Sequence, residues 1–126
     1  MNSQRNQRAL AALETGSWAE RLALVILLMK GYRPLALRYG GKGGEIDLIA
    51  KRGRTIIFVE VKARAAGADA ATAITAEKIR LVNRRIRDWR ARNPWAGGCT
   101  LRADAVFIGR GAWPRHVANI FPVEML

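Results

Sequence analysis

The order of the predicted elements places this chain in the α/β class. One helical segment comes first, three strand segments follow, and a second helix leads to a fourth strand and a weaker last one. A hydrophobic fraction of 50% and a charged fraction of 25% are ordinary for a folded protein. The length of 126 residues suits one domain, and no repeat or linker divides the chain. We therefore expect residues 1–126 to form a single domain, with residues 1–15 frayed at its start.

The first helix is expected to begin after Ser17 and to end at Lys30. Ser17 and Glu20 have the spacing of a capping box, in which the two residues satisfy the free backbone N–H groups of the first turn. Gly31, with Pro34 beyond it, marks the end. The helix is apolar on nearly all sides, which predicts that most of its surface is buried.

The second helix is expected to follow Thr75 as its N-cap and to end before Pro94. Residues 65–74, which come before it, are mostly alanine, glycine and threonine and predict a loop. The apolar residues of this helix recur at helical spacing and predict its buried face: Ile79, Val82, Ile86 and Trp89.

Five segments rich in β-branched and aromatic residues predict strands: residues 35–39, 45–51, 55–62, 101–109 and, more weakly, 117–121. The second and third of these segments are joined by a short polar turn around Lys51-Arg52-Gly53-Arg54, which is typical of a β-hairpin. Four glycines in residues 40–44 predict a turn before the hairpin.

The charge balance and the rare residue types narrow the class of protein. Its 22 Lys and Arg residues against 10 Asp and Glu residues give a net charge of +12, which favours nucleic acid as partner and, second, an anionic membrane surface. Cys99 is the only cysteine, which excludes an internal disulfide and points to a reducing compartment, the cytoplasm. His116 is the only histidine, which argues against a zinc site. The longest apolar run has eight residues where a membrane span needs about twenty, and we identify no signal peptide.

Two charged residues interrupt the otherwise apolar segment TIIFVEVK. Because side chains alternate between the faces of a strand, Glu60 and Lys62 share one face with Phe58 and lie roughly 6.5–7 Å apart. If the hairpin loop has an even number of residues centred on Arg52-Gly53, Asp47 lies opposite Phe58 and diagonal to Glu60, within roughly 7–8 Å. An odd loop would turn Asp47 to the other face.

Asp47, Glu60 and Lys62 are the residue types that metal-assisted phosphodiester hydrolysis needs. Mg²⁺, which Mn²⁺ can replace, usually takes one or two carboxylates besides water and phosphate. Metal-bound water is more acidic, and a lysine beside it can orient the water or stabilise the transition state. The alternative is an exposed ion pair of Glu60 and Lys62. Against it, the strand is apolar on both faces, and a buried carboxylate is costly unless it is paired or metal-bound.

The blocks GGEIDLIAKRG and IIFVEVKAR, with TGSWAERLAL before them and the Lys78 region after them, resemble the YraN-like family of small bacterial proteins. The resemblance extends from Gly16 to Ile108. That family is similar to archaeal Holliday junction resolvases and to the PD-(D/E)xK nuclease group. The resemblance implies a restriction-endonuclease-like core, which is a central mixed β-sheet flanked by helices. By analogy with the resolvases, it also implies a homodimer.

The resemblance assigns roles to individual residues. Asp47 becomes the motif aspartate, Glu60 the motif acid and Lys62 the motif lysine. Glu20 matches the glutamate that resolvases place on the first helix, although the capping box also accounts for it. The implied catalytic set is therefore Glu20, Asp47, Glu60 and Lys62, with the three acids as ligands of Mg²⁺ or Mn²⁺. The family often has an aromatic residue where this chain has Ala103, so no function is carried over to Asp104.

The second helix is strongly basic, with seven basic residues and one acid between residues 78 and 92. Arg80, Arg84 and Arg87 form a stripe away from the packing face, and such a stripe can follow the phosphates of a nucleic acid. The alternative is an ordinary solvated helix face. The residues expected to contact nucleic acid, from this helix and from the hairpin turn, are Lys78, Arg80, Arg84, Arg87, Arg52 and Arg54.

Three functional hypotheses remain open. The first is a metal-dependent endonuclease that acts on branched or otherwise structured DNA or RNA. The second is a non-catalytic nucleic-acid-binding module of the same fold, and the third is an interaction protein for an anionic partner. The grouped charges of Asp47, Glu60 and Lys62 favour the first two. The sequence does not separate these two, because a site that binds Mg²⁺ can still turn over poorly.

Overall fold

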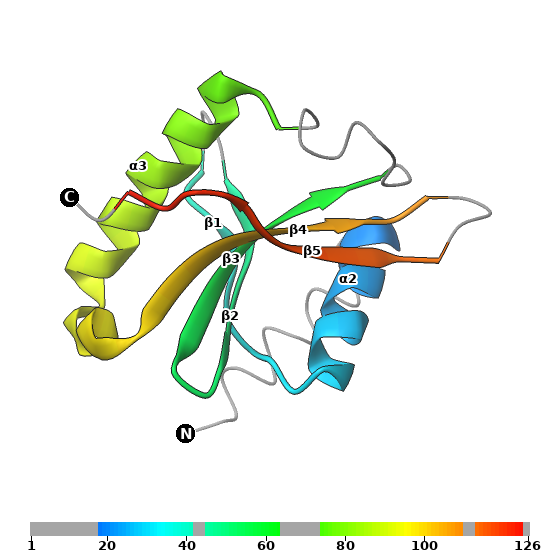
Figure 1. Cartoon of the computed structure of the whole chain (residues 1–126), viewed down its shortest axis with the longest axis horizontal. Coiled ribbons are helices and arrows are strands. Elements are labelled where there is room, and N and C mark those ends of the chain that lie inside the picture. The colour runs from blue at the N-terminus through cyan, green and yellow to red at the C-terminus, as the bar shows by residue number, and fades with distance from the viewer. Residues whose placement is uncertain (1–17, 42–44, 64–73, 110–112, 125–126) are drawn as a thin grey trace.

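The computed structural model describes residues 18–41, 45–63, 74–109 and 113–124 of the chain. The helices and strands, in chain order, are α2 (Trp18–Met29), β1 (Arg33–Tyr39), β2 (Ile46–Arg52), β3 (Thr55–Lys62), α3 (Ala76–Arg92), the short 3-10 helix η2 (Pro94–Gly98), β4 (Thr100–Phe107) and β5 (Arg115–Phe121). The strands form one five-stranded sheet in the order β1-β2-β3-β4-β5. Figure 1 shows α2 and α3 on opposite sides of this sheet.

The sheet is mixed because of one crossover. β3 and β4 are parallel along their whole length, from Thr55 opposite Thr100 to Lys62 opposite Phe107, whereas all other neighbours are antiparallel. A parallel pair cannot be joined by a hairpin and needs a long connection, and α3 lies between β3 and β4 in the chain. The predicted α/β class with a central mixed sheet flanked by helices is confirmed.

Each face of the sheet has its own core. On one side, Phe58 of β3 lies in a buried cluster with Ile86 and Trp89 of α3. On the other side, its neighbour Val59 lies in a second cluster with Leu24 of α2. The period of two sends successive residues of β3 into different cores, which is why this strand is apolar nearly throughout. The predicted packing face of α3 is confirmed, with three residues buried and one partly buried: Val82, Ile86, Trp89 and Ile79.

Local signals located the other elements well. Thr75 is the N-cap of α3, and its hydroxyl accepts a hydrogen bond from the backbone N–H of Lys78 at 3.1 Å. All five predicted strands are present, with ends that differ by at most two residues. The predicted frayed start, residues 1–15, and most of the predicted loop at 65–74 lie outside the described residues.

The prediction that α2 is buried on most sides is wrong. The helix buries one face, formed by Ala19, Ala23, Leu24 and Leu27. It exposes a second group of large apolar side chains: Trp18, Val25, Leu28 and Met29. The physical reason is that α2 forms an outer layer and has the sheet on one side only.

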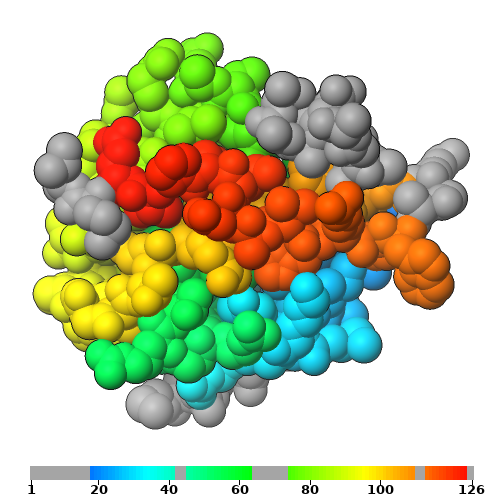
Figure 2. Space-filling view, viewed as in Figure 1, coloured from blue at the N-terminus to red at the C-terminus, as the bar shows by residue number. Residues whose placement is uncertain are grey.

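The last strand, β5, is an edge strand of the sheet and lies on the face shown in Figure 2. There β5 runs as an orange-to-red band across the molecule, with residues of α3 above and to the left of it. No helix in the described ranges is long and apolar enough to cross a membrane.

Candidate functional site

The hairpin turn sets the position of Asp47 against β3. Arg52 pairs with Thr55, so the loop is the two residues Gly53 and Arg54, and Gly53 takes the left-handed φ of 60° that such tight turns require. The condition of an even loop length is therefore met. The predicted register is wrong by two residues, because Ile49 and not Asp47 lies opposite Phe58. Asp47 is consequently brought directly to the level of Glu60, and not diagonal to it.

Asp47 lies where β2 separates from β3. The last backbone pair of these strands is Leu48 with Val59. One step further, Oδ2 of Asp47 accepts a hydrogen bond from the backbone N–H of Val61 at 2.8 Å. The carboxylate thus takes the place of a backbone carbonyl in the strand pairing. The side chain of Asp47 also lies within hydrogen-bonding reach of the Glu60 carboxyl group.

Glu60 is held between two lysines. Nζ of Lys62, on the same strand, lies 4.0 Å from Oε1, and Nζ of Lys78, from the first turn of α3, lies 3.5 Å from Oε2. The Glu60 side chain is only 12% exposed. Its buried Oε2 accepts no hydrogen bond from the described part of the chain. Ion pairing at these distances only partly replaces the water that burial has removed.

Burial disfavours the ionised form of both acids. Burial, followed by the nearby charge of Glu60, raises the pKa of Asp47 to about 7. Burial also raises the pKa of Glu60, although Lys78 and Lys62 oppose this shift. Two adjoining carboxyl groups with raised pKa values form a site whose charged state needs a cation. Such a pair is also typical of functional sites.

Glu20 reaches the same region from the other side of the sheet. It lines a small pocket with Asp47 and Arg38. Its Oε1 accepts a hydrogen bond from Arg38 Nη2 at 2.8 Å, and its charge contributes to the raised pKa of Asp47. Ser17, the other half of the predicted capping box, lies outside the described residues. The cation that Glu20 pairs with in this structure is therefore the Arg38 guanidinium. Among the described residues, no three Asp, Glu, His or Cys side chains are placed to hold a metal ion together.

The four basic residues predicted on α3 to contact nucleic acid differ in their exposure and in their partners. Arg80 and Arg84 are exposed and line a shallow pocket with Glu77. Arg87 is also exposed, but it pairs with Glu124 at 3.0 Å. Lys78 points to the acids, as described above. The predicted stripe of exposed arginines is therefore present. Arg80 and Arg84 form none of the ion pairs described here, and they lie closer to the acid site along the helix than Arg87 does.

The two hairpin arginines lie at the other end of the sheet. Arg52 donates a hydrogen bond to the backbone oxygen of Lys30 at 3.1 Å and covers the ring of Tyr32 at 4.5 Å. Arg54 donates to the backbone oxygen of Gly98 at 3.2 Å. Arg52 lies five residue steps along the extended strand from Asp47, which is roughly 16 Å. These side chains therefore do not extend the surface around the acids.

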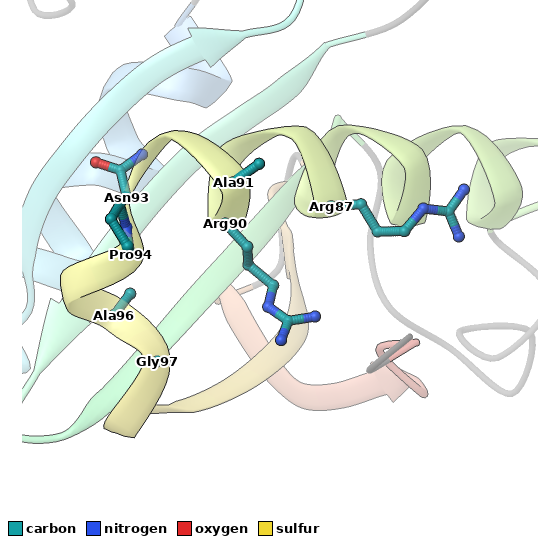
Figure 3. A pocket seen from close by; sticks show the side chains of 7 residues that line it. All are labelled: Arg87, Arg90, Ala91, Asn93, Pro94, Ala96 and Gly97. Atoms are coloured by element: carbon teal, nitrogen blue, oxygen red, sulfur yellow. The ribbon is translucent and has the colours of Figure 1, made fainter.

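A larger pocket of about 320 Å³ lies at the C-terminal end of α3 (Figure 3). Its lining residues are Arg87, Arg90, Ala91, Asn93, Pro94, Ala96 and Gly97. Arg90 and Arg87 direct their guanidinium groups to the same side of the helix. The lining contains no acid and no nucleophile, so this pocket does not have the groups for hydrolysis. We therefore place the candidate site at the acids and not in the larger cavity.

Asp104 is a buried carboxylate that the sequence did not assign, and it is fully paired. Arg102 donates to both of its oxygens at 2.8 Å, His116 Nε2 lies 2.7 Å from Oδ2, and the backbone N–H of Asn119 donates to Oδ1 at 3.0 Å. The signal in the sequence was an aspartate within the apolar segment ADAVF, two residues after an arginine. Because Arg102 belongs to β4 and the other two partners belong to β5, Asp104 joins these two strands.

The mixed sheet between two helices, with an acid pair where β2 and β3 separate, defines an α/β protein with a restriction-endonuclease-like core. The chain belongs to the uncharacterised protein family UPF0102, whose sequence profile matches residues 19–108. This confirms the predicted membership in the YraN-like family.

Three relatives show how close the similarity is. A UPF0102 protein of Methylorubrum extorquens (strain PA1) is 60% identical over 88% of this chain and 87% of the relative. One of Methylobacterium nodulans is 54% identical over 94% of this chain and 92% of the relative. The UPF0102 protein bll0669 of Bradyrhizobium diazoefficiens is 44% identical over 88% of this chain and 84% of the relative. The chain and these relatives therefore match over most of their lengths.

Proposed function

We propose that this protein hydrolyses phosphodiester bonds in structured DNA or RNA, with Mg²⁺ or Mn²⁺ as cofactor. The observation that supports the proposal best is the acid pair. Asp47 and Glu60 meet at the open end of a hairpin, both have raised pKa values, and Lys62 stands beside them. A purely structural ion pair would place one acid beside one base. It would not bury two carboxyl groups beside each other, where burial disfavours the charged form of both.

The acid pair fits a divalent cation. Mg²⁺ commonly takes one or two carboxylates and completes its shell with water and phosphate, so two protein acids suffice. Glu60 Oε2 is buried and accepts no hydrogen bond from the described residues, which is the situation that a cation relieves. When bound, such an ion supplies an acidic water and offsets the charge of the phosphate.

Other residues of the chain hold Asp47 in place and supply positive charge for the phosphates. The N–H of Val61 holds Asp47 in place. The Lys62 side chain is 28% exposed and so can reach a phosphate that enters from solvent, where an ammonium stabilises the charge that develops in the transition state. Arg80 and Arg84 are exposed and follow Lys78 along α3 by two and six residues, which is about half a turn and one and two-thirds turns. We assign to these arginines the contacts to neighbouring phosphates of the strand.

One observation favours a second candidate, a binding module that has kept the fold and lost turnover. Glu20 is engaged by Arg38, and the three acids do not converge on one point in the described structure. A site with only two ligands can bind nucleic acid through its cations and still cleave poorly.

A cleavage screen over branched, flapped, single-stranded and duplex substrates tests the proposal. We expect cleavage in Mg²⁺ or Mn²⁺, none in EDTA, and none with Glu60→Gln. Asp88→Asn, which removes an exposed acid from a later part of α3, is the matched control and should cleave normally. If the wild type binds these substrates and cleaves none of them, the binding module replaces the nuclease.

A further inference from the structure

Lys78 is placed in the acid site by the start of α3. Its Nζ lies 3.5 Å from Glu60 Oε2 and donates a hydrogen bond to the backbone oxygen of Glu45 at 3.3 Å. The N-cap also fixes the backbone of Lys78, because the backbone N–H of Lys78 donates a hydrogen bond to the Thr75 hydroxyl. The side chain is 26% exposed, so most of it is removed from solvent. Lys78 is therefore held toward Glu60 by two contacts.

The first turn of a helix is a poor place for a lysine. The free N–H groups there carry partial positive charge and favour acids, as with Glu77 one residue earlier. A positive side chain at the third helical position opposes this field. Contact with Glu60 and with the Glu45 oxygen offsets that cost, whereas a solvated surface lysine would gain nothing from this position.

We propose that Lys78 is the built-in counter-ion of the metal site, which neutralises Glu60 in the metal-free protein and must leave Glu60 when a divalent cation binds. The inference rests on the proposed metal-dependent function. The two lysines divide the carboxylate between them, with Lys62 at Oε1 and Lys78 at Oε2. Lys78 makes the closer contact, and it makes it to the oxygen that is buried and accepts no hydrogen bond from the described residues. A cation on that oxygen and the ammonium would repel each other at this distance.

The role of Lys78 is measurable as manganese affinity, without any substrate. Free Mn²⁺ is followed by electron paramagnetic resonance during titration of the full chain at pH 8. Lys78→Met should bind Mn²⁺ about tenfold more tightly than the wild type, because a competing positive charge has gone. Lys78→Arg keeps the charge and should bind with wild-type affinity. Lys51→Met removes the same charge at the hairpin end and should also match the wild type.

Two failures are distinguishable. If the wild type binds Mn²⁺ and Lys78→Met binds it no more tightly, the role of Lys78 is overturned while the proposed metal site stands. If neither the wild type nor Lys78→Met binds Mn²⁺, the proposed metal site and the counter-ion role both fall. Circular dichroism establishes that each variant is folded, and Lys78→Gln replaces Lys78→Met if the latter is not. Binding by Lys78→Met alone would support the inference most directly.

Discussion

Oδ2 of Asp47 lies 2.8 Å from the backbone nitrogen of Val61, so the acid of β2 is bonded to the strand that carries Glu60 and Lys62. This bond has two consequences. It fixes the separation of the two acids by backbone geometry and not by side-chain rotamers alone. It also holds the carboxylate in a partly buried place beside Glu60, where burial, followed by the charge of Glu60, raises the pKa of Asp47.

The acid pair should destabilise the metal-free protein at high pH. The folded-state pKa of Asp47 is about 7, above its ordinary value of 3.8. The cost of ionising it is therefore absent below about pH 4 and is complete once the pH has risen through 7. Asp47→Asn keeps an oxygen for the Val61 N–H and removes the charge. In EDTA it should raise the free energy of unfolding by about 1–2 kcal/mol at pH 8, and by nothing at pH 4.

Urea denaturation at the two pH values measures this difference. Asp88→Asn is the control, because the hydrogen bond from Tyr39 lowers the pKa of Asp88 and its removal should give no gain at pH 8. A gain for Asp47→Asn that is equal at pH 4 and pH 8 would mean that its charge is not the cause.

Lys62 should matter for turnover and not for affinity. If the site is catalytic, Lys62→Ala should lower the cleavage rate by about two to three orders of magnitude, the usual loss for one transition-state donor. Its charge is one of 22 basic residues, so binding in EDTA should change little. Single-turnover cleavage in Mn²⁺ beside gel-shift binding tests both statements. Lys51→Ala is the matched control, and equal cleavage by Lys62→Ala and Lys51→Ala would remove Lys62 from the mechanism.

The exposed arginines of α3 should set the salt dependence of binding. Each lost phosphate contact lowers the slope of log affinity against log salt by about one unit. Arg80→Gln and Arg84→Gln should each produce this change. Arg87→Gln should produce less, because Arg87 already pairs with Glu124. Arg52→Gln, at the far end of the sheet, should leave the slope unchanged, and an equal loss for Arg52 and Arg80 would show that binding does not follow α3.

Asp104 should be the acid on which folding depends most. Burial alone would raise its pKa, but hydrogen bonds with His116, Arg102 and the Asn119 backbone outweigh burial and hold the pKa below its ordinary value. Its stabilisation is therefore present above about pH 4 and is lost as the pH falls through the lower folded-state pKa. Asp104→Asn should cost about 3 kcal/mol at pH 7, because it leaves Arg102 without its anion and disrupts the hydrogen bonds of the buried network.

Urea denaturation at pH 7 and pH 2.5 checks this prediction. The difference between wild type and Asp104→Asn should be smaller at the lower pH, because the stabilisation by the ionised carboxylate is lost as the pH falls. A cost below about 1 kcal/mol at pH 7 would mean that the network is not a buried ion pair in solution.

Much of the fold could be predicted because its signals are local. Thr75 caps α3 through a bond to a residue three positions on, and the apolar spacing from Val82 to Trp89 is a property of one helix. The hairpin followed from a short turn between two apolar segments. Its register did not, because a glycine with positive φ suits both Arg52-Gly53 and Gly53-Arg54 as turn centres, and only the pairing of Arg52 with Thr55 in the folded chain selects one.

The sequence by itself determined the α/β class, the apolar face of α3 and the identity of Asp47, Glu60 and Lys62 as the charged residues at the open end of the hairpin. Only the tertiary structure decided what surrounds them. It brought Lys78 to Glu60 from a helix that follows the loop, and Arg38 to Glu20 from a neighbouring strand. Alternation and helical periodicity describe one element at a time. Contacts between elements depend on how the sheet, its crossover and its two helices pack, and that information is distributed over the whole chain.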